Sequence, residues 1–211
     1  MKITWLGHSS FMLEDGSVTL ITDPYDETVG YSQPGQKADI VVSSHDHFDH
    51  NYFEGVKGDF EIFNAPGKKE IRGITITGVA TFHDGEEGGA RGQNVVSVIE
   101  MGGLRICHLG DLGHKLSDDQ ALQIGKVDVL LTPVGGFFTI DAQEAAETAK
   151  QLNADIVVPM HFKNDACTWD IGTEKPFVEL LKDEYSTEYS DKSWFEPKKG
   201  DRKLIVLKHR F

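Results

Sequence analysis

Residues 45–50, with the sequence His-Asp-His-Phe-Asp-His, form the densest group of chemically active side chains in the chain. They directly follow the apolar run 39–44, which is short and β-branched and therefore predicts a buried strand. Open α/β sheets place their ligands at the C-terminal ends of strands. Nitrogen and oxygen donors at this density suit zinc, iron or manganese, so we expect a metal site at this strand end.

Three further strand-like runs also end at a metal-type side chain. His83 follows the run 74–80, Asp111 follows 104–109, and His161 follows 155–160. Because strand ends can meet at one edge of a sheet, residues far apart in the sequence can reach one ion. A single histidine after a strand is more often structural, but three such ends together with residues 45–50 indicate a shared site.

The spacing His-x-His-x-Asp-His after an apolar strand resembles the signature of the metallo-β-lactamase fold superfamily, and the resemblance covers nearly the whole chain. It implies a single domain, residues 1–211, of the α+β class. The implied architecture is a four-layer αββα sandwich of two mixed β-sheets with outer helices. One or two metal ions would bind along one edge of that sandwich.

Seven positions match the ligands of the superfamily's two-metal centre, and all carry the expected residue type. Three histidines match the first site: His45, His47 and His83. Three further residues match the second site: Asp49, His50 and His161. The carboxylate that bridges both ions is matched by Asp111. The complete set favours two divalent ions over one.

This ligand set implies a hydrolase whose nucleophile is a hydroxide held between the two ions beside Asp111. Asp49 and Asp111 are therefore candidate catalytic residues as well as ligands. The oxygen-reducing diiron members carry a glutamate at the position of His47, so this histidine favours zinc, although manganese and iron accept the same donors. The sequence contains no G-x-S-x-G motif. We expect an ester, lactone or phosphodiester bond to be cleaved.

Several short motifs narrow the resemblance further. They resemble motifs of metal-dependent hydrolases near the ascorbate-phosphate lactonase-like and phospholipase-D-like branches, and they lie at residues 7–10, 23–24, 110–114, 133–136 and 159–161.

Three residues in or near these motifs each have two possible roles. His8 could donate to a ligand carboxylate or to substrate, or it could be a turn histidine bonded to backbone. Asp23 could accept a hydrogen bond from a ligand histidine, or it could simply form an Asp-Pro turn. His114 could protonate a leaving group as a catalytic acid, but a structural role at a loop or helix start is the more common one for such a residue.

Two residues are candidates for substrate binding. Arg91 is the one cation in the acidic, glycine-rich loop beyond His83, and it could hold a phosphate or carboxylate. The alternative is a surface ion pair with Glu86 or Glu87. Phe138 could form a wall of the pocket or belong to the core. Phe48, inside the histidine motif, is expected to pack beneath the site.

The charge balance bears on the partners of the protein. The chain has 21 Lys and Arg against 34 Asp and Glu, which gives a formal net charge of −13. Such a surface repels nucleic acid, so a small molecule is the favoured partner. Arg91 is the reason to expect an anionic one. No apolar run reaches the roughly 18 residues that a membrane span needs, and no basic amphipathic helix predicts membrane docking. Two isolated cysteines fit a cytoplasmic protein.

Two other functions compete with a small-molecule hydrolase. One is a nucleic-acid phosphodiesterase of the same fold, which the charge disfavours. The other is a non-catalytic metal-binding or ligand-sensing module, which the complete ligand set disfavours. The sequence leaves the substrate open and does not decide whether the chain forms a homo-oligomer.

Hydrophobic patterns predict the elements that must position the site. Asp15-Gly16 predicts a hairpin turn, the spacing of Asp141 and Glu144 predicts a helix cap, and residues 25–38 read as a surface loop. Helices are expected at 142–152 and 173–183, with a short one at 51–55. Strands are expected at 3–6, 10–13, 18–22, 39–44, 61–63, 73–80, 94–100, 104–109, 127–132, 155–160 and 204–207.

Overall fold

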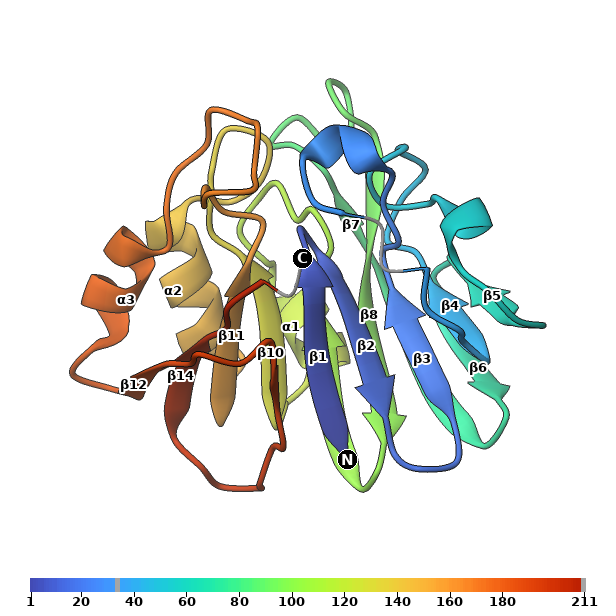
Figure 1. Ribbon diagram of the computed structural model, residues 1–211. Coiled ribbons are helices and arrows are strands. Elements are labelled where there is room, and N and C mark those ends of the chain that lie inside the picture. The colour runs from blue at the N-terminus through green and yellow to red at the C-terminus, as the bar shows by residue number, and fades with distance from the viewer. Residues whose placement is uncertain (33–34, 210–211) are drawn as a thin grey trace.

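The fold consists of two β-sheets packed face to face, as a computed structural model of residues 1–32 and 35–209 shows (Figure 1). The first sheet has six strands in the order β13-β1-β2-β3-β4-β5. Its strands are β1 (Lys2–Gly7), β2 (Ser10–Glu14), β3 (Thr19–Thr22), β4 (Ile40–Val42), β5 (Glu61–Phe63) and β13 (Trp194–Phe195). Antiparallel pairing of β13, β1, β2 and β3 gives way to parallel pairing of β3, β4 and β5, so the sheet is mixed.

The second sheet has eight strands in the order β12-β14-β11-β10-β9-β8-β7-β6. Its strands are β6 (Gly67–Ile71), β7 (Ile74–Phe82), β8 (Gln93–Met101), β9 (Leu104–His108), β10 (Val129–Pro133), β11 (Ile156–Met160), β12 (Ser186–Tyr189) and β14 (Lys203–Val206). Strands β6 to β9 pair antiparallel, and the others pair parallel. The predicted sandwich of two mixed sheets is confirmed.

The hydrophobic core lies between the inner faces of the two sheets. Side chains of the first sheet such as Trp5, Phe11 and Leu13 join those of the second, such as Ile76 and Val98, in one buried cluster. Burial of each such side chain contributes about 1.5–3 kcal/mol. The core therefore fixes the two sheets against each other and keeps the strand ends at constant positions.

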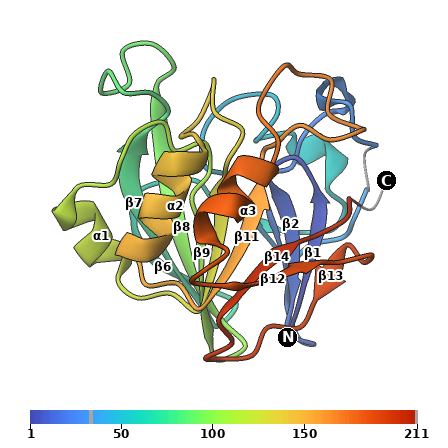
Figure 2. The ribbon, with the colours of Figure 1, turned by 90° about the vertical axis from the view of Figure 1, so that its left-hand side faces the viewer.

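The outer layers of the sandwich differ from each other. Helices α1 (Asp118–Ile124), α2 (Ala142–Gln151) and α3 (Lys175–Leu181) all lie over the eight-stranded sheet (Figure 2). On the other side, an apolar cluster that includes Met12 and Val41 is covered by Phe53, Val56 and Phe60. The short helix predicted at 51–55 is there as the 3₁₀ helix η2 (Phe53–Gly55). Irregular chain with one 3₁₀ turn thus takes the place of the expected outer α-helix on this face.

Local signals in the sequence explain several elements. Asp15 accepts hydrogen bonds from the backbone of Ser17 and Val18, which closes the β2–β3 hairpin as predicted. Asp141 and Glu144 form the predicted capping box of α2. The predicted loop 25–38 contains the 3₁₀ helix η1 (Glu27–Val29), and its residues 33–34 lie outside the described part of the chain.

The loops that follow β1, β4, β7, β9 and β11 lie at one end of the sandwich, uppermost in Figure 1. This end contains every predicted ligand, because each ligand comes after the last residue of its strand. Within residues 1–32 and 35–209, no helix has the length and apolarity to cross a membrane.

Candidate metal centre

The predicted first site is a group of three imidazoles. His45, His47 and His83 each offer one ring nitrogen, and these atoms all lie within 4.8 Å of one another. His45 and His47 lie in the turn after β4, whereas His83 directly follows β7 of the other sheet. The two sheets therefore contribute jointly to this group of imidazoles.

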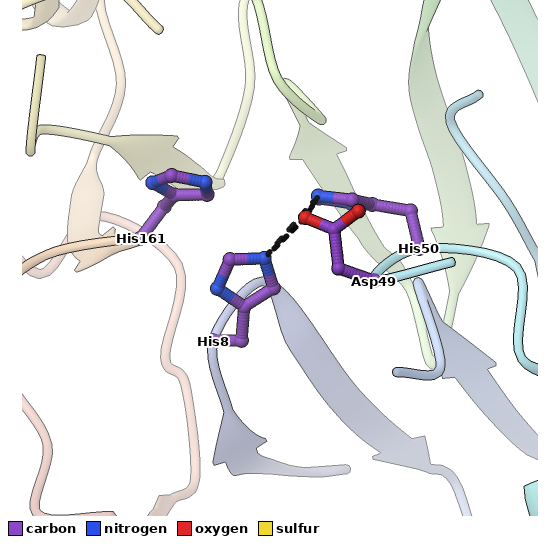
Figure 3. A group of neighbouring side chains, drawn as sticks. All are labelled: His8, Asp49, His50 and His161. Atoms are coloured by element: carbon purple, nitrogen blue, oxygen red, sulfur yellow. Dashed lines mark hydrogen bonds and ion pairs between the residues drawn. The ribbon is translucent and has the colours of Figure 1, made fainter. Parts of the chain in front are cut away.

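The predicted second site contains one residue more than expected. Ligand atoms of His8, Asp49, His50 and His161 lie within 4.8 Å of one another (Figure 3). The Nε2 atom of His8 is 3.2 Å from Asp49 Oδ2 and 3.3 Å from His50 Nε2. Of the roles considered for His8, the structure shows the contact with a carboxylate of the expected ligand set, that of Asp49.

Asp111 lies between the two groups. Its Oδ2 atom is 3.3 Å from the Nε2 atoms of His50, His83 and His161. One carboxylate thus faces imidazoles of both sites, which is the arrangement that a bridging ligand requires. Asn94 holds the turn that presents it, because the Asn94 side chain accepts a hydrogen bond from the Asp111 N–H and donates to the Leu109 carbonyl.

The donor atoms meet the chemical requirements of bound cations. Within the described residues, His45 Nε2, His161 Nε2 and Asp111 Oδ1 are buried without any hydrogen-bond partner. Buried polar atoms without partners are costly, and a native structure rarely leaves several of them in one place. Divalent cations at this position would supply the missing partner for all three, so the residues fit the metals that the ligand pattern predicts.

Asp23 orients two histidines of the predicted ligand set, one from each group. It directly follows β3, is fully buried, and its Oδ2 atom accepts a hydrogen bond from His50 Nδ1 at 2.7 Å. The same oxygen accepts from Ser44 Oγ at 2.7 Å, and Ser44 Oγ contacts His45 Nδ1 at 2.9 Å. With Nδ1 as the donor in each ring, Nε2 of His50 and of His45 keeps its lone pair for a metal. The predicted hydrogen bond between Asp23 and a histidine of the expected ligand set is therefore present, here with His50.

The electrostatic field of the site favours positive charge. Burial alone would lower the pKa of His50, but the carboxylates of Asp111, Asp49 and Asp23 raise it well above its usual value. At His8, burial together with His161 outweighs the hydrogen bond with Asp49 and lowers the pKa to about 4. Burial opposes ionisation of Asp111, yet His161 and His50 hold the pKa of Asp111 well below its usual value. The carboxylates would stabilise metal cations in the same way.

Backbone strain also marks the site. Seven non-glycine residues of the described chain have positive φ, and three of them are His8 (φ 50°), Asp23 (φ 39°) and His161 (φ 50°). Each of these conformations costs energy in an L-residue and persists only where the surrounding structure enforces it. For His8 the enforcement is visible, since its carbonyl accepts from Trp5 Nε1 at 2.9 Å and from the His161 N–H at 3.3 Å.

A cavity of about 410 Å³ opens above the two groups of donor side chains. It is lined by His47, Phe48, Asp49, His83, Ala90, Arg91, Asp111, Phe138 and Trp169. The prediction that Phe48 packs beneath the site is wrong: its side chain is 54% exposed at the cavity. The motif turns sharply after His47, and buried Asp49 and His50 occupy the inward positions, which leaves Phe48 on the outer side of the turn.

Arg91 and Phe138, the two candidates for substrate binding, both line this cavity. The Arg91 guanidinium lies 5.6 Å from the centre of the Phe138 ring, within the range of a cation–π contact. Among the described residues, Arg91 makes no ion pair with Glu86 or Glu87. Its charge is therefore available to a ligand.

A carboxylate next to the metal centre builds the loop that carries Arg91. Asp84 accepts four backbone N–H groups: those of Glu86 and Gly88 on Oδ1, and those of Ala90 and Arg91 on Oδ2, at 2.6–3.0 Å. These bonds, with that of Arg91 foremost, lower the pKa of Asp84 to about 2. The loop therefore folds around the carboxylate of Asp84, which directly follows His83 in the sequence.

His114 does not line the cavity. Its Nε2 accepts the Phe82 N–H at 3.1 Å, and its Nδ1 contacts the Lys115 carbonyl at 2.8 Å. With Nε2 as acceptor and Nδ1 as donor, the ring has no proton left for a leaving group. The geometry supports the structural reading, in which His114 braces the chain just before His83.

Two residues that shape the cavity or the loop of Arg91 were not predicted from the sequence. Trp169 lines the cavity and packs edge-on against His8, with ring centres 5.1 Å apart. It lies in an irregular segment, where no periodicity indicates its position. Asp84 could have been found, because an Asp-Gly pair at the start of a glycine-rich loop is a frequent acceptor of several backbone N–H groups.

Comparison with known proteins agrees with the fold. Residues 2–161 match the beta-lactamase superfamily domain. The chain belongs to the metallo-β-lactamase superfamily. A crystal structure from Thermotoga maritima, described as a Zn-dependent hydrolase of this superfamily, is 39% identical, covers 99% of both chains and superposes with a TM-score of 0.84.

Sequence relatives carry related descriptions. A UPF0173 protein of Pyrococcus furiosus is 31% identical over 179 residues, which cover 77% of this chain and 83% of the relative. A UPF0173 metal-dependent hydrolase of Methanoculleus marisnigri is 31% identical over 186 residues, covering 77% of this chain and 81% of the relative. The narrower resemblance to lactonase-like and phospholipase-D-like branches stays a prediction.

Proposed function

We propose that the protein is a binuclear metal-dependent hydrolase that cleaves an ester, lactone or phosphodiester bond in a small anionic molecule. The observation that carries the proposal is the convergence of two donor groups on Asp111 at the floor of one cavity. The names of the relatives as metal-dependent hydrolases support the reaction class.

The ions would supply the nucleophile, because divalent metals lower the pKa of a bound water to about 7. The chain's own carboxylates, Asp49 and Asp111, hold the positive charge at the cavity floor. None of the residues that line the cavity is a serine, threonine or cysteine. A covalent mechanism with one of these side chains as the nucleophile therefore has no support in the site.

The cavity walls favour an anionic substrate with an apolar part. Arg91 is the only Lys or Arg among the lining residues, and it stands at the edge of the acidic metal centre. Phe138 and Trp169, with ring centres 5.3 Å apart, form an apolar wall on the side of the second site. A carboxylate or phosphate on Arg91 would direct the scissile bond toward Asp111, while the two rings exclude water.

The donors also support a choice of metal. Three imidazoles and one carboxylate match the four-coordinate preference of zinc, so zinc is proposed for the site of His45, His47 and His83. The second site offers carboxylates as well as imidazoles, and zinc, manganese and iron all accept such donors. Two divalent ions per chain remain the proposal.

The charge of the chain supports a small molecule as the partner, with neither nucleic acid nor a membrane. A surface with net charge −13 opposes both phosphate backbones and anionic lipids. The cytoplasmic location and a homo-oligomeric state stay open predictions of the sequence.

The test is a hydrolysis screen with protein purified without chelators. Lactones, p-nitrophenyl esters and phosphodiesters are offered in matched anionic and neutral forms, before and after removal of metal by a chelator. We expect turnover that is lost with the metal and restored by zinc or manganese, and that is abolished in Asp111→Ala. Full activity and full metal content in Asp111→Ala would contradict the assignment.

A further inference from the structure

The strongest unassigned feature is the position of His8, which is not one of the seven ligand positions of the resemblance. His8 follows β1, and its side chain is 1% exposed. Figure 3 shows the His8 ring directed at Asp49 and His50, with His161 on the opposite side of His8. The backbone holds it there at φ 50° through the two hydrogen bonds to its carbonyl.

Several lone pairs point at one place in this group. In its neutral form, His50 keeps the proton on Nδ1 that it donates to Asp23, so Nε2 then presents a lone pair. Asp49 Oδ2 lies 3.2 Å from that atom, and His8 Nε2 lies 3.2 Å and 3.3 Å from the two. A proton on His8 Nε2 can point at one of these two acceptors but not at both. A cation at the centre of the three atoms would satisfy all of them.

The distances match the edges of a coordination polyhedron. With metal–ligand bonds of about 2.0–2.1 Å, two ligands are about 2.9 Å apart at an angle of 90° and about 3.4 Å apart at the tetrahedral angle. The three edges among His8, Asp49 and His50 measure 3.2–3.3 Å. The edges from Asp111 Oδ2 to His50 and His161 measure 3.3 Å and belong to the same range.

We infer that His8 is a direct ligand of the second metal ion. This inference rests on the proposed metal centre and adds a residue to it. The second site then has five protein donors: His8, Asp49, His50, Asp111 and His161. One further position would complete an octahedron, and six-coordination is usual for manganese and iron, whereas zinc prefers four ligands. The two sites therefore differ in preference, with zinc in the first and a six-coordinate metal in the second.

The alternative is that His8 only donates a hydrogen bond to Asp49, without contact to the metal. Cadmium distinguishes the two roles, because a scalar coupling between ¹¹³Cd and an imidazole ¹⁵N is transmitted only through a direct bond. Protein with ¹⁵N-labelled histidine is loaded with ¹¹³Cd, and His8→Asn assigns the signal. Asparagine tolerates the positive φ at this position, and its side chain is too short to replace Nε2.

We expect a ¹¹³Cd coupling on His8 Nε2 that is lost in His8→Asn. Calorimetric titration should show that His8→Asn weakens manganese binding at the second site by about a hundredfold or more. Zinc affinity at the first site should stay within about threefold of the wild-type value. The matched control is His114→Asn, which removes a histidine bonded only to backbone and outside the second site. It should leave the coupling on His8 and the manganese affinity unchanged.

Metal uptake without a coupling on His8 would overturn this inference and leave the binuclear hydrolase intact. A manganese affinity unchanged in His8→Asn would do the same. Failure of the wild-type protein to bind any of the three metals would overturn both the inference and the proposed function.

Discussion

The contact between Asp23 and His50 can be tested by replacing one oxygen of the Asp23 carboxylate with an NH₂ group. In Asp23→Asn, the amide has the same shape as the carboxylate but only one acceptor oxygen. Asp23 now accepts the Ser44 N–H on Oδ1 and the His50 Nδ1–H and Ser44 Oγ–H on Oδ2. Whichever way the amide turns, its NH₂ group faces one of these donors.

Each orientation has a definite cost. If the NH₂ group faces His50, the ring must move its proton to Nε2, and the lone pair for the second metal is lost. If it faces Ser44, a buried backbone N–H loses its acceptor, which costs about 1–3 kcal/mol. For a domain of this size that cost lowers the Tm by about 2–12 °C. Loss of such a supporting contact typically weakens metal binding by about 10–100-fold.

The assay is calorimetric titration of metal into chelator-treated protein, together with thermal unfolding. We expect the second binding event to weaken at least about tenfold. Asp155→Asn is the matched control, because Asp155 is also a buried carboxylate that accepts a backbone N–H but lies away from the cavity. Two binding events of wild-type affinity in Asp23→Asn would refute the reasoning that Asp23 sets the tautomer of His50.

Three further changes test the cavity. Arg91→Gln should raise KM about tenfold for anionic substrates and leave KM for neutral analogues unchanged; an equal loss for both would remove Arg91 from substrate binding. Asp84→Asn should speed hydrogen exchange of the amides of residues 86–91 about tenfold or more, as measured by mass spectrometry of the exchanged peptides. It should also raise KM for anionic substrates but not for neutral analogues. The control Glu87→Gln should have neither effect. Trp169→Ala should lower affinity for substrates with an aromatic group about tenfold, measured as competitive inhibition by product analogues, and an unchanged inhibition constant would contradict its role as a wall.

The strand-end pattern made most of the metal centre predictable. His83, Asp111 and His161 each follow a buried strand. These runs indicate strands rather than buried helices because they are short and rich in β-branched residues. Contacts between segments that are distant in the sequence could be predicted less well. Sequence spacing indicates that His8 follows a strand, but its approach to Asp49 depends on the pairing of β1 with β2 and on the packing of the sheets.

The strands that the sequence patterns did not predict share one physical property, which is their exposure. Strand β6 reads Gly-Lys-Lys-Glu-Ile and lies exposed at a sheet edge, where pairing with β7 rather than an apolar face defines it. Strand β12 is likewise an exposed edge. Helix α1 carries a signal that could have been used, since Ser117 and Gln120 form a capping box. Patterns of burial cannot indicate strands that are hardly buried.

Metal content is the most direct test of the binuclear centre. The protein is purified without chelators and analysed by inductively coupled plasma mass spectrometry beside His45→Ala. The account predicts about two divalent ions per chain in the wild type and fewer in the variant, because two donor groups share Asp111. A wild-type chain that carries no metal and takes up none on titration with zinc or manganese would contradict it.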